Sequence, residues 1–218
     1  MSQILTIIGM GKGISMSVAR KFAGEGFKIA MIARSAENLK EFKQNLQNEG
    51  FEAHYFVADA AKTEALTAAL TTIEKTLGAT DVLFYNVAKV KKQNILDETA
   101  ESLADDFKVN VGAALTSVNI VIPAMKDKGK GAILLTGGGL SINPFPAYGS
   151  LAIGKAGIRN LALSLSKALQ YTGIKVGTVT ISGFVNPKDE KYNPDAIAGL
   201  FWKLYLQEDE GKETEIVY

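Results

Sequence analysis

The sequence predicts an α/β protein with a doubly wound parallel sheet of about seven strands flanked by helices. Short apolar runs rich in β-branched residues alternate along the whole chain with stretches of helix length, and the glycine-rich segment 9–15 follows the first apolar run. This alternation is typical of βαβ units, whose parallel strands are covered by helices on both faces. At 218 residues, the chain is expected to form a single domain over residues 1–218.

The elements follow from the apolar pattern, taken in order. Ile4 to Ile8 is predicted to be a buried strand, and the helix after it ends at Gly26. The next helix places Leu39, Phe42 and Leu46 at the three-to-four spacing of one buried face. The expected strands are 4–8, 28–33, 52–57, 81–85, 132–136, 175–181 and 214–217. The expected helices are 14–25, 36–49, 62–77, 99–127, 148–172 and 194–206.

The glycine-rich segment between the first strand and the first helix is the most informative motif. A tight turn needs residues without a Cβ, and the first N–H groups of the helix then point at an anion. A dinucleotide pyrophosphate fits such a place, and the whole pattern is that of a Rossmann-type fold. Glycine spacing alone also suits a structural turn of any α/β protein, so that alternative stays open at this point.

Arg34 follows the second strand, where a dinucleotide fold meets the adenosine ribose. An acidic residue there would accept hydrogen bonds from a free 2′-hydroxyl, whereas the guanidinium of Arg34 matches a 2′-phosphate. The sequence therefore predicts NADP(H) rather than NAD as the cofactor. Lys12, inside the glycine turn, is a second candidate for the same phosphate. The alternative is that both are solvated loop cations.

Composition excludes several classes of function. Lys and Arg number 24 against 23 Asp and Glu, so no overall field attracts nucleic acid or an anionic membrane. The chain has no Cys and one His, which excludes cysteine-ligated and multi-histidine metal sites. His54 is expected to be a partly exposed strand residue. No apolar run is expected to reach the length of a membrane span, and no signal segment precedes the first strand, so a soluble cytoplasmic protein is predicted.

Five segments, each in the expected place, resemble motifs of the short-chain dehydrogenase/reductase family. They are the turn 8–15, Val57-Ala58-Asp59, Tyr85-Asn86-Val87-Ala88, segment 107–112 around Asn110, and Ser182-Gly183-Phe184-Val185. The resemblance covers nearly the whole chain. With the turn and Arg34, it implies these cofactor-binding residues: Gly9, Lys12, Gly13, Ile14, Arg34, Asp59, Asn86, Ala88, Lys155, Gly183 and Val185. It also implies that Asn110 kinks a long helix and holds a water in a proton relay.

The catalytic residues depart from the family pattern. The resemblance identifies Lys155 as the family lysine, but Leu151 stands where the tyrosine is expected, and residues 136–139 lack the usual serine. Tyr148, seven residues before Lys155, gives a spacing similar to the divergent enoyl-thioester reductase branch. If both were helical, about 10 Å of helix axis would separate them, so direct contact is not expected. Tyr148, Lys155 and Asn110 are the predicted catalytic residues, and a packing role for Tyr148 is the alternative.

Two functions remain open from the sequence. The first is an NADP(H)-dependent oxidoreductase that transfers hydride to or from a small carbonyl or enoyl substrate. The second is a catalytically degenerate NADP-binding protein that acts as a sensor or scaffold. Lys89, Lys91 and Lys92 either dock an anionic substrate or form a solvated loop. By resemblance, the long helices are expected to form subunit contacts in a homodimer or homotetramer. The segment before the last strand is short for the family, so the substrate pocket is expected to be open or to be completed by a neighbouring subunit.

Overall fold

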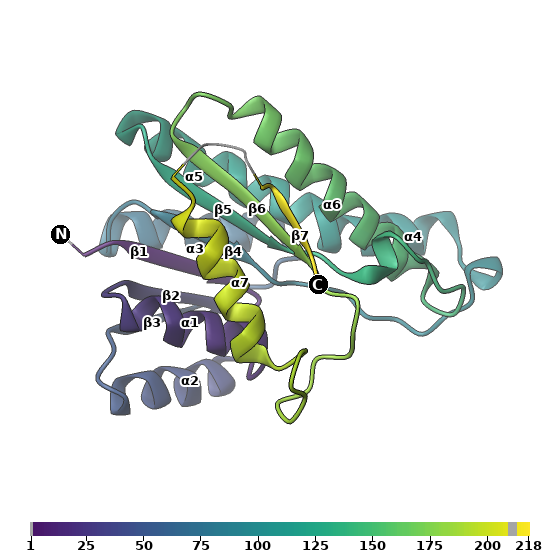
Figure 1. The fold of residues 1–218 in the computed structure, drawn as a ribbon, viewed down its shortest axis with the longest axis horizontal. Coiled ribbons are helices and arrows are strands. Elements are labelled where there is room, and N and C mark those ends of the chain that lie inside the picture. Colours follow the sequence, from purple (N-terminus) through teal and green to yellow (C-terminus); the bar gives the residue numbers. More distant parts are fainter. Residues whose placement is uncertain (1, 209–212) are drawn as a thin grey trace.

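A computed structural model describes residues 2–208 and 213–218, and within them the predicted parallel sheet is present (Figure 1). Neighbouring strands pair in parallel in the order β3-β2-β1-β4-β5-β6-β7. The order reverses between β1 and β4, which is the switch point where such sheets bind ligands. The strands are β1 Ile4–Ile8, β2 Lys28–Ala33, β3 Ala53–Val57, β4 Val82–Tyr85, β5 Gly131–Thr136, β6 Ile174–Thr180 and β7 Glu215–Val217.

Helices connect the strands and cover both faces of the sheet. They are α1 Ile14–Gly24, α2 Ala36–Asn48, α3 Thr63–Thr76, α4 Ala100–Phe107, α5 Ala113–Lys128, α6 Gly149–Ala168 and α7 Pro194–Leu206. A π-helical turn, η2 Lys108–Gly112, joins α4 to α5. Two short 3-10 turns, η1 Ile95–Asp97 and η3 Gly139–Ser141, follow β4 and β5. Most boundaries lie within one or two residues of those predicted.

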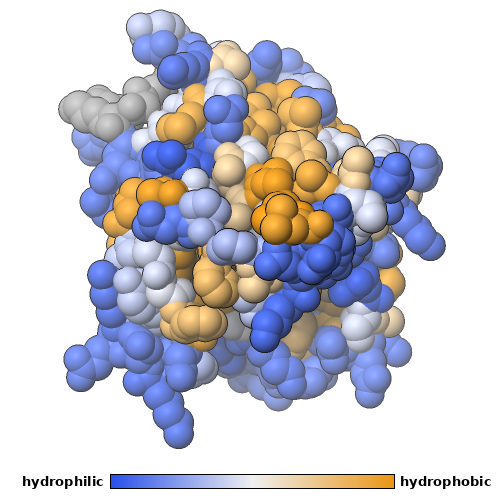
Figure 2. All heavy atoms as spheres, turned by 90° about the vertical axis from the view of Figure 1, so that its right-hand side faces the viewer, coloured by the Kyte–Doolittle hydropathy of each residue, from blue (hydrophilic) through white to orange (hydrophobic). Residues whose placement is uncertain are grey.

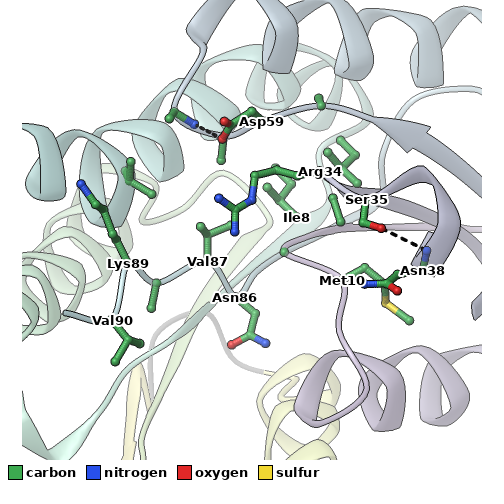
Figure 3. Close-up of a pocket in the computed structure, with 18 residues that line it drawn as sticks. Ile8, Met10, Arg34, Ser35, Asn38, Asp59, Asn86, Val87, Lys89 and Val90 are labelled. Atoms are coloured by element: carbon green, nitrogen blue, oxygen red, sulfur yellow. Dashed lines mark hydrogen bonds between the residues drawn. The ribbon is translucent and has the colours of Figure 1, made fainter. Parts of the chain in front are cut away.

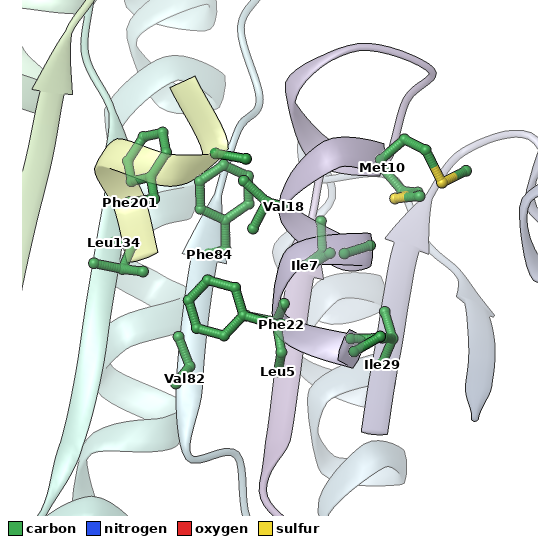
Figure 4. Packing of buried hydrophobic residues seen from close by; sticks show 14 of the residues in the cluster. Leu5, Ile7, Met10, Val18, Phe22, Ile29, Val82, Phe84, Leu134 and Phe201 are labelled. Atoms are coloured by element: carbon green, nitrogen blue, oxygen red, sulfur yellow. The ribbon is translucent and has the colours of Figure 1, made fainter. Parts of the chain in front are cut away.

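Two hydrophobic cores lie on opposite faces of the sheet because successive strand residues point in opposite directions. Leu5 and Ile7 of β1 pack toward α1, α2 and α7, whereas Ile4 and Ile8 pack toward α3, α5 and α6. Figure 4 shows Phe84 of β4 between α1 and α7, and its ring centroid lies 4.9 Å from that of Phe201. Burial on both faces explains why the strands read as continuous apolar runs.

Two predicted helices differ from those in the structure. The stretch expected as one helix over 99–127 is interrupted by the π turn η2, in agreement with the kink expected around Asn110. The helix expected to begin at residue 148 begins at Gly149, and Tyr148 precedes it with a non-helical backbone (φ −131°, ψ 41°). The condition under which the spacing of Tyr148 and Lys155 was considered, that both are helical, is therefore not met.

One helical stretch needs a correction of the sequence expectation. In the described residues, Ala100–Lys128 is long and apolar enough to cross a membrane by length and composition alone, with 39% of its most apolar window buried. Ala114, Val118 and Met125 on its inner side belong to the core beneath the sheet. Length and composition cannot separate a core helix from a membrane span, so the feature is weak evidence for either.

Candidate active site

The glycine turn after β1 is built around Gly9, whose backbone has a φ of +88°. A Cβ on Gly9 would lie 2.6 Å from the backbone oxygen of Asn86 at the end of β4. The N–H groups of Gly9 and Met10 both donate to the backbone oxygen of Ile32 on β2, at 3.0 and 3.1 Å. A left-handed backbone and this close approach together require glycine at position 9.

The first turn of α1 is left open to an anion. Gly13 precedes the helix, and no side chain caps the N–H groups of the first turn. A Cβ on Gly11 or Gly13 would meet nothing within 4 Å, so space surrounds this turn. Uncapped N–H groups and the positive end of the helix dipole favour a phosphate here.

Ser15 joins the glycine turn to the end of β4. Its Oγ donates to the backbone oxygen of Gly9 at 2.8 Å, and Nδ2 of Asn86 donates to the same Oγ at 2.8 Å. The sequence predicted Asn86 as a site residue but gave Ser15 no role. The signal in the sequence that could have found Ser15 is its hydroxyl group, which stands where the family motif has its last glycine.

A cleft of about 570 Å³ opens at the switch point, beyond the carboxyl ends of β1 to β4 (Figure 3). It brings together five of the predicted cofactor residues, which are Gly9, Arg34, Asp59, Asn86 and Ala88. Arg34 is exposed and reaches into this cleft. No ion pair holds its guanidinium among the residues that the structure describes, which leaves it available to a ligand anion.

The other predicted cofactor residues lie outside the lining of this cleft. Lys12 points toward α2, where its Nζ lies 3.3 Å from Oε1 of Glu41, and Gly13 and Ile14 remain in the open turn. Gly183 follows β6, where any side chain would overlap the ring of Tyr192. The remaining two are Lys155 on α6 and Val185 in the loop after β6, which is 40% exposed.

Lys155 reaches from α6 to the end of β5. Its Nζ donates to the backbone oxygen of Thr136 at 2.8 Å, and part of the side chain remains accessible. Burial lowers the pKa of its ammonium to about 8, because few protein groups replace its lost hydration. A Cβ on Gly138 would lie 3.3 Å from Cδ and Cε of Lys155, so the aliphatic part of the lysine side chain passes directly over Gly138.

Asn110 lies in η2 and connects this turn to the loop after β4. Its Oδ1 accepts a hydrogen bond from the N–H of Lys89 at 2.7 Å, while the buried Nδ2 has no protein partner within the described chain. The amide of Asn110 leaves no room for a side chain at position 154, because a Cβ on Gly154 would lie 2.6 Å from Nδ2. The hydroxyl of Tyr85 donates to Val109 at 2.6 Å, which satisfies a carbonyl of the π turn.

The family positions for serine and tyrosine hold no hydroxyl. Leu151, at the tyrosine position, is 8% exposed and packs inside the first turns of α6, and the segment 136–139 that replaces the serine includes Gly138, whose backbone is extended. Tyr148 lies just before α6, and its ring centroid is 6.3 Å from that of Phe145. Tyr148, the candidate phenol at this end of α6, thus belongs to a loop.

Two of the three lysines after β4 are paired within the protein, and the third, Lys92, is exposed. Nζ of Lys89 lies 2.6 Å from Oδ1 of the buried Asp106 on α4, and Nζ of Lys91 lies 2.8 Å from Oε1 of Glu98. Burial acts to raise the pKa of Asp106, but the Lys89 ammonium and a hydroxyl of α6 together hold it below its usual value. The sequence offered anion docking or a solvated loop for these lysines, and it missed Asp106, which lies 17 positions further on in the chain.

The comparisons with known proteins agree with this geometry. A family model described as short chain dehydrogenase matches residues 3–196. The chain belongs to the short chain dehydrogenase family. It is 23% identical over 214 residues to Dehydrogenase/reductase SDR family member 4 of Mus musculus, covering 98% of this chain and 74% of that protein. It is 29% identical over 171 residues to a short chain dehydrogenase of Pseudocercospora fijiensis, covering 77% of this chain and 55% of the relative.

A solved structure of a metagenomic short-chain oxidoreductase in complex with NADP has the same fold, with a TM-score of 0.89 at 23% identity. It covers 99% of this chain and 95% of that chain. In this member of the short chain dehydrogenase family, the residues present fit a dinucleotide. The uncapped start of α1, the glycine without space for a Cβ, and Arg34, which has no ion pair within the described residues, would suit the phosphates of such a ligand.

Proposed function

We propose that this protein is an NADP(H)-dependent oxidoreductase that transfers hydride to or from a small carbonyl or enoyl substrate. Membership of the short chain dehydrogenase family supports the reaction class. The observation that carries the cofactor choice is Arg34, which reaches into the cleft after β2 with no acidic neighbour in Ala33-Arg34-Ser35. A guanidinium matches a 2′-phosphate but not the free hydroxyl of NAD.

The residues of the cleft divide into those that hold the cofactor and those that serve the substrate. Gly9 and the start of α1 would hold the pyrophosphate, Asp59 the adenine, and Lys155 the nicotinamide ribose. The bound cofactor supplies or accepts the hydride. Tyr148, or a water held near Asn110, would then move the proton that balances the transfer.

The position of Tyr148 bears on the reaction type. Carbonyl reduction needs an acid close to the carbon that accepts hydride, but Leu151 stands at the position of the family tyrosine and residues 136–139 lack the family serine. Conjugate reduction of an enoyl group places charge on an oxygen further away, where a phenol outside the helix can reach. Tyr148 in the loop before α6 therefore favours an enoyl substrate within the proposed class.

The same two positions favour a second candidate function. With Leu151 in place of the family tyrosine and no serine in residues 136–139, the protein could bind NADP without catalysis and act as a sensor or scaffold. Cofactor positioning without an acid still leaves slow turnover, because a positioned acid contributes a factor of about 10² to 10⁴. Measured NADPH oxidation across aldehydes, ketones, quinones and enoyl thioesters distinguishes the two functions.

Calorimetry with NADPH, NADP and NADH tests the cofactor assignment directly. We expect the phosphorylated forms to bind more tightly, and Arg34→Asp to remove that preference because a carboxylate repels the 2′-phosphate. Lys126→Asp is the control, since Lys126 lies in the last turn of α5 outside the cleft lining, and it should retain most of the preference. Absence of heat and of thermal protection with millimolar NADPH and NADP would overturn the proposed function.

A further inference from the structure

The loop after β6, residues 181–193, has few buried side chains of its own. Residues 184–191 are all exposed. Figure 1 shows the loop extending away from the sheet before α7, and Figure 2 shows hydrophobic side chains exposed among hydrophilic ones at this end of the molecule. The resemblance places two cofactor-binding residues, Gly183 and Val185, in this loop. Because an exposed segment opens easily, other contacts must hold it if it is to bind a ligand.

Tyr218, which follows β7, is fixed to the end of β6 by its backbone. Its N–H donates to the backbone oxygen of Thr180 at 2.9 Å, and its own backbone oxygen accepts from the N–H of Ser182 at 2.7 Å. These bonds continue the parallel pairing of β7 with β6 to the point where the loop begins. The side chain of Tyr218 is partly buried against the core. Tyr218 is therefore a fixed point beside the loop.

The side chain of Tyr218 holds the far end of the loop. Its hydroxyl donates to the backbone oxygen of Lys191 at 2.6 Å. Its ring centroid lies 5.4 Å from that of Tyr192, in an edge-to-face arrangement. Nζ of Lys191 lies 5.0 Å from the ring centroid of Tyr192 and 5.1 Å from that of Tyr218. Edge-to-face ring pairs and cation–π contacts are both favourable, so they fasten this end of the loop to the sheet.

Tyr192 connects the end of the loop to its start. Any side chain at position 183 would overlap the ring of Tyr192, so this ring lies against the backbone of Gly183. The backbone oxygen of Tyr192 accepts from the N–H of Asn186 at 3.1 Å, and its N–H donates to Oδ1 of Asp189 at 2.7 Å. The positions of Gly183 and of the residues after it therefore depend on Tyr192.

The start of the loop lies far from the proposed 2′-phosphate site. A Cβ on Gly139 would lie 2.9 Å from Cα of Ser182, and a Cβ on Gly138 would lie 3.3 Å from Cδ of Lys155. The loop thus begins near the lysine proposed to hold the nicotinamide ribose. Arg34 follows β2, which lies four places from β6 in the sheet. Four strand spacings amount to roughly 19 Å, so a ligand held at Arg34 by its adenosine alone does not reach this loop.

We propose that Tyr192 and Tyr218 are positioning residues for the nicotinamide end of the cofactor. By fastening the loop to the sheet, they keep Gly183 and Val185 where these residues would contact that end of NADP(H). This inference rests on the proposed function, because it takes the ligand to be a dinucleotide. A ligand binds more weakly when the competent conformation of its site is populated only part of the time. Releasing the loop should therefore weaken binding of the whole dinucleotide but not of its adenosine half.

Calorimetry with NADP and with 2′,5′-ADP tests this difference, because 2′,5′-ADP carries the adenosine and the 2′-phosphate but no nicotinamide. For Tyr192→Ser, we expect the affinity for NADP to fall about tenfold, as for a loop in the competent position about one tenth of the time. The affinity for 2′,5′-ADP should stay unchanged. Tyr192→Phe keeps the ring and should keep the wild-type affinity for both ligands. An equal loss for both ligands in Tyr192→Ser, or no loss, would overturn the inference.

A matched pair of variants tests the hydroxyl of Tyr218. Tyr218→Phe removes only the hydrogen bond to Lys191 and should lower the affinity for NADP about threefold, with no change for 2′,5′-ADP. Tyr205→Phe is the control, since it removes a phenol that donates to Oε1 of Gln3 at 3.3 Å, before β1 at the opposite edge of the sheet. It should leave both affinities unchanged, and an equal loss of NADP affinity in the two variants would contradict the inference.

Limited digestion with trypsin, with the cleaved sites identified by mass spectrometry, reports on the loop itself. Lys188 and Lys191 are exposed within it. We expect faster cleavage at these lysines in Tyr192→Ser than in the wild type, and slower cleavage of the wild type with saturating NADP but not with 2′,5′-ADP. Unchanged cleavage in Tyr192→Ser would show that the ring does not hold the loop, and the inference would be wrong.

The wild-type protein distinguishes failure of this inference from failure of the proposed function. If it binds neither NADP nor 2′,5′-ADP, the proposed function is wrong. If it binds both equally tightly, the nicotinamide end contributes nothing to binding, and only the inference about the two tyrosines is overturned.

Discussion

Lys155 is a charged residue whose surroundings differ strongly from free solution. Burial lowers the pKa of its ammonium from 10.5 to about 8, so between these values the unfolded chain holds a proton that the folded protein has released. The free energy of unfolding should therefore rise with pH from about 8 to 10.5 through this group, and below pH 8 the buried charge destabilises the fold.

Denaturant titrations of the wild type and of Lys155→Met between pH 7 and pH 10 measure this contribution. The wild type should gain stability relative to the variant as the pH rises, because other lysines and tyrosines titrate equally in both proteins. A constant difference between the two would show that the ammonium keeps its ordinary pKa.

Tyr148 is the second residue with a specific prediction. If its phenol donates the proton, Tyr148→Phe should lower turnover by a factor of about 10² to 10⁴ while cofactor affinity stays unchanged. Tyr171→Phe is the control, since Tyr171 lies at the opposite end of the strands. Turnover of Tyr148→Phe within a factor of two of the wild type would assign the proton to a water instead.

Among the elements, the turn between β1 and α1 offers a matched pair of glycines. Gly9→Ala must place a Cβ 2.6 Å from the backbone oxygen of Asn86 and adopt a left-handed backbone, whereas a Cβ on Gly11 meets nothing within 4 Å. The left-handed conformation alone costs about 1–2 kcal/mol. Gly9→Ala should lower the free energy of unfolding by at least that amount, and Gly11→Ala should leave it nearly unchanged, as measured by urea denaturation without cofactor.

The strands and most helices could be predicted because their apolar periodicity is local. The carboxyl-edge rule then located Arg34, Asp59 and Asn86 correctly around one cleft. The π turn could not be predicted from spacing, since an α and a π turn bury similar residues, and only the resemblance pointed to a kink at Asn110. Tyr148 was placed one residue inside a helix that begins after it, which is the usual uncertainty of a helix end.

Tertiary contacts account for what the sequence did not predict in the site. Lys89 and Asp106 are far apart in the chain and meet only because α4 packs beside the loop after β4. Lys12 is a candidate for the 2′-phosphate from its place in the glycine motif, and its ion pair with Glu41 of α2 could not be predicted from the sequence. Both cases depend on how the helices lie against the sheet, which periodicity does not determine.

For the whole molecule, we predict a homodimer or homotetramer. Phe107, Leu115 and Ile153 on α4, α5 and α6 are 40, 41 and 39% exposed, so each of the helices expected to form subunit contacts presents an apolar side chain to a neighbour. Leu115→Glu with Ile153→Glu should shift the protein toward a monomer in sedimentation velocity, because burying two carboxylates in a subunit contact is unfavourable. The control Leu206→Glu, at the end of α7, should leave the mass unchanged, and a wild-type monomer would contradict the prediction.

The π turn between α4 and α5 has a consequence for the molecule's exterior. A π turn contains close to one residue more than an α turn, and one residue corresponds to about 100° of rotation around a helix axis. Deleting one residue from η2 would restore regular winding but rotate α4 relative to α5 by that angle. Asp106 would move away from Lys89, and Phe107 would move to a different face of the helix. Insertions and deletions in η2 are therefore expected to change which surface the protein presents to other molecules.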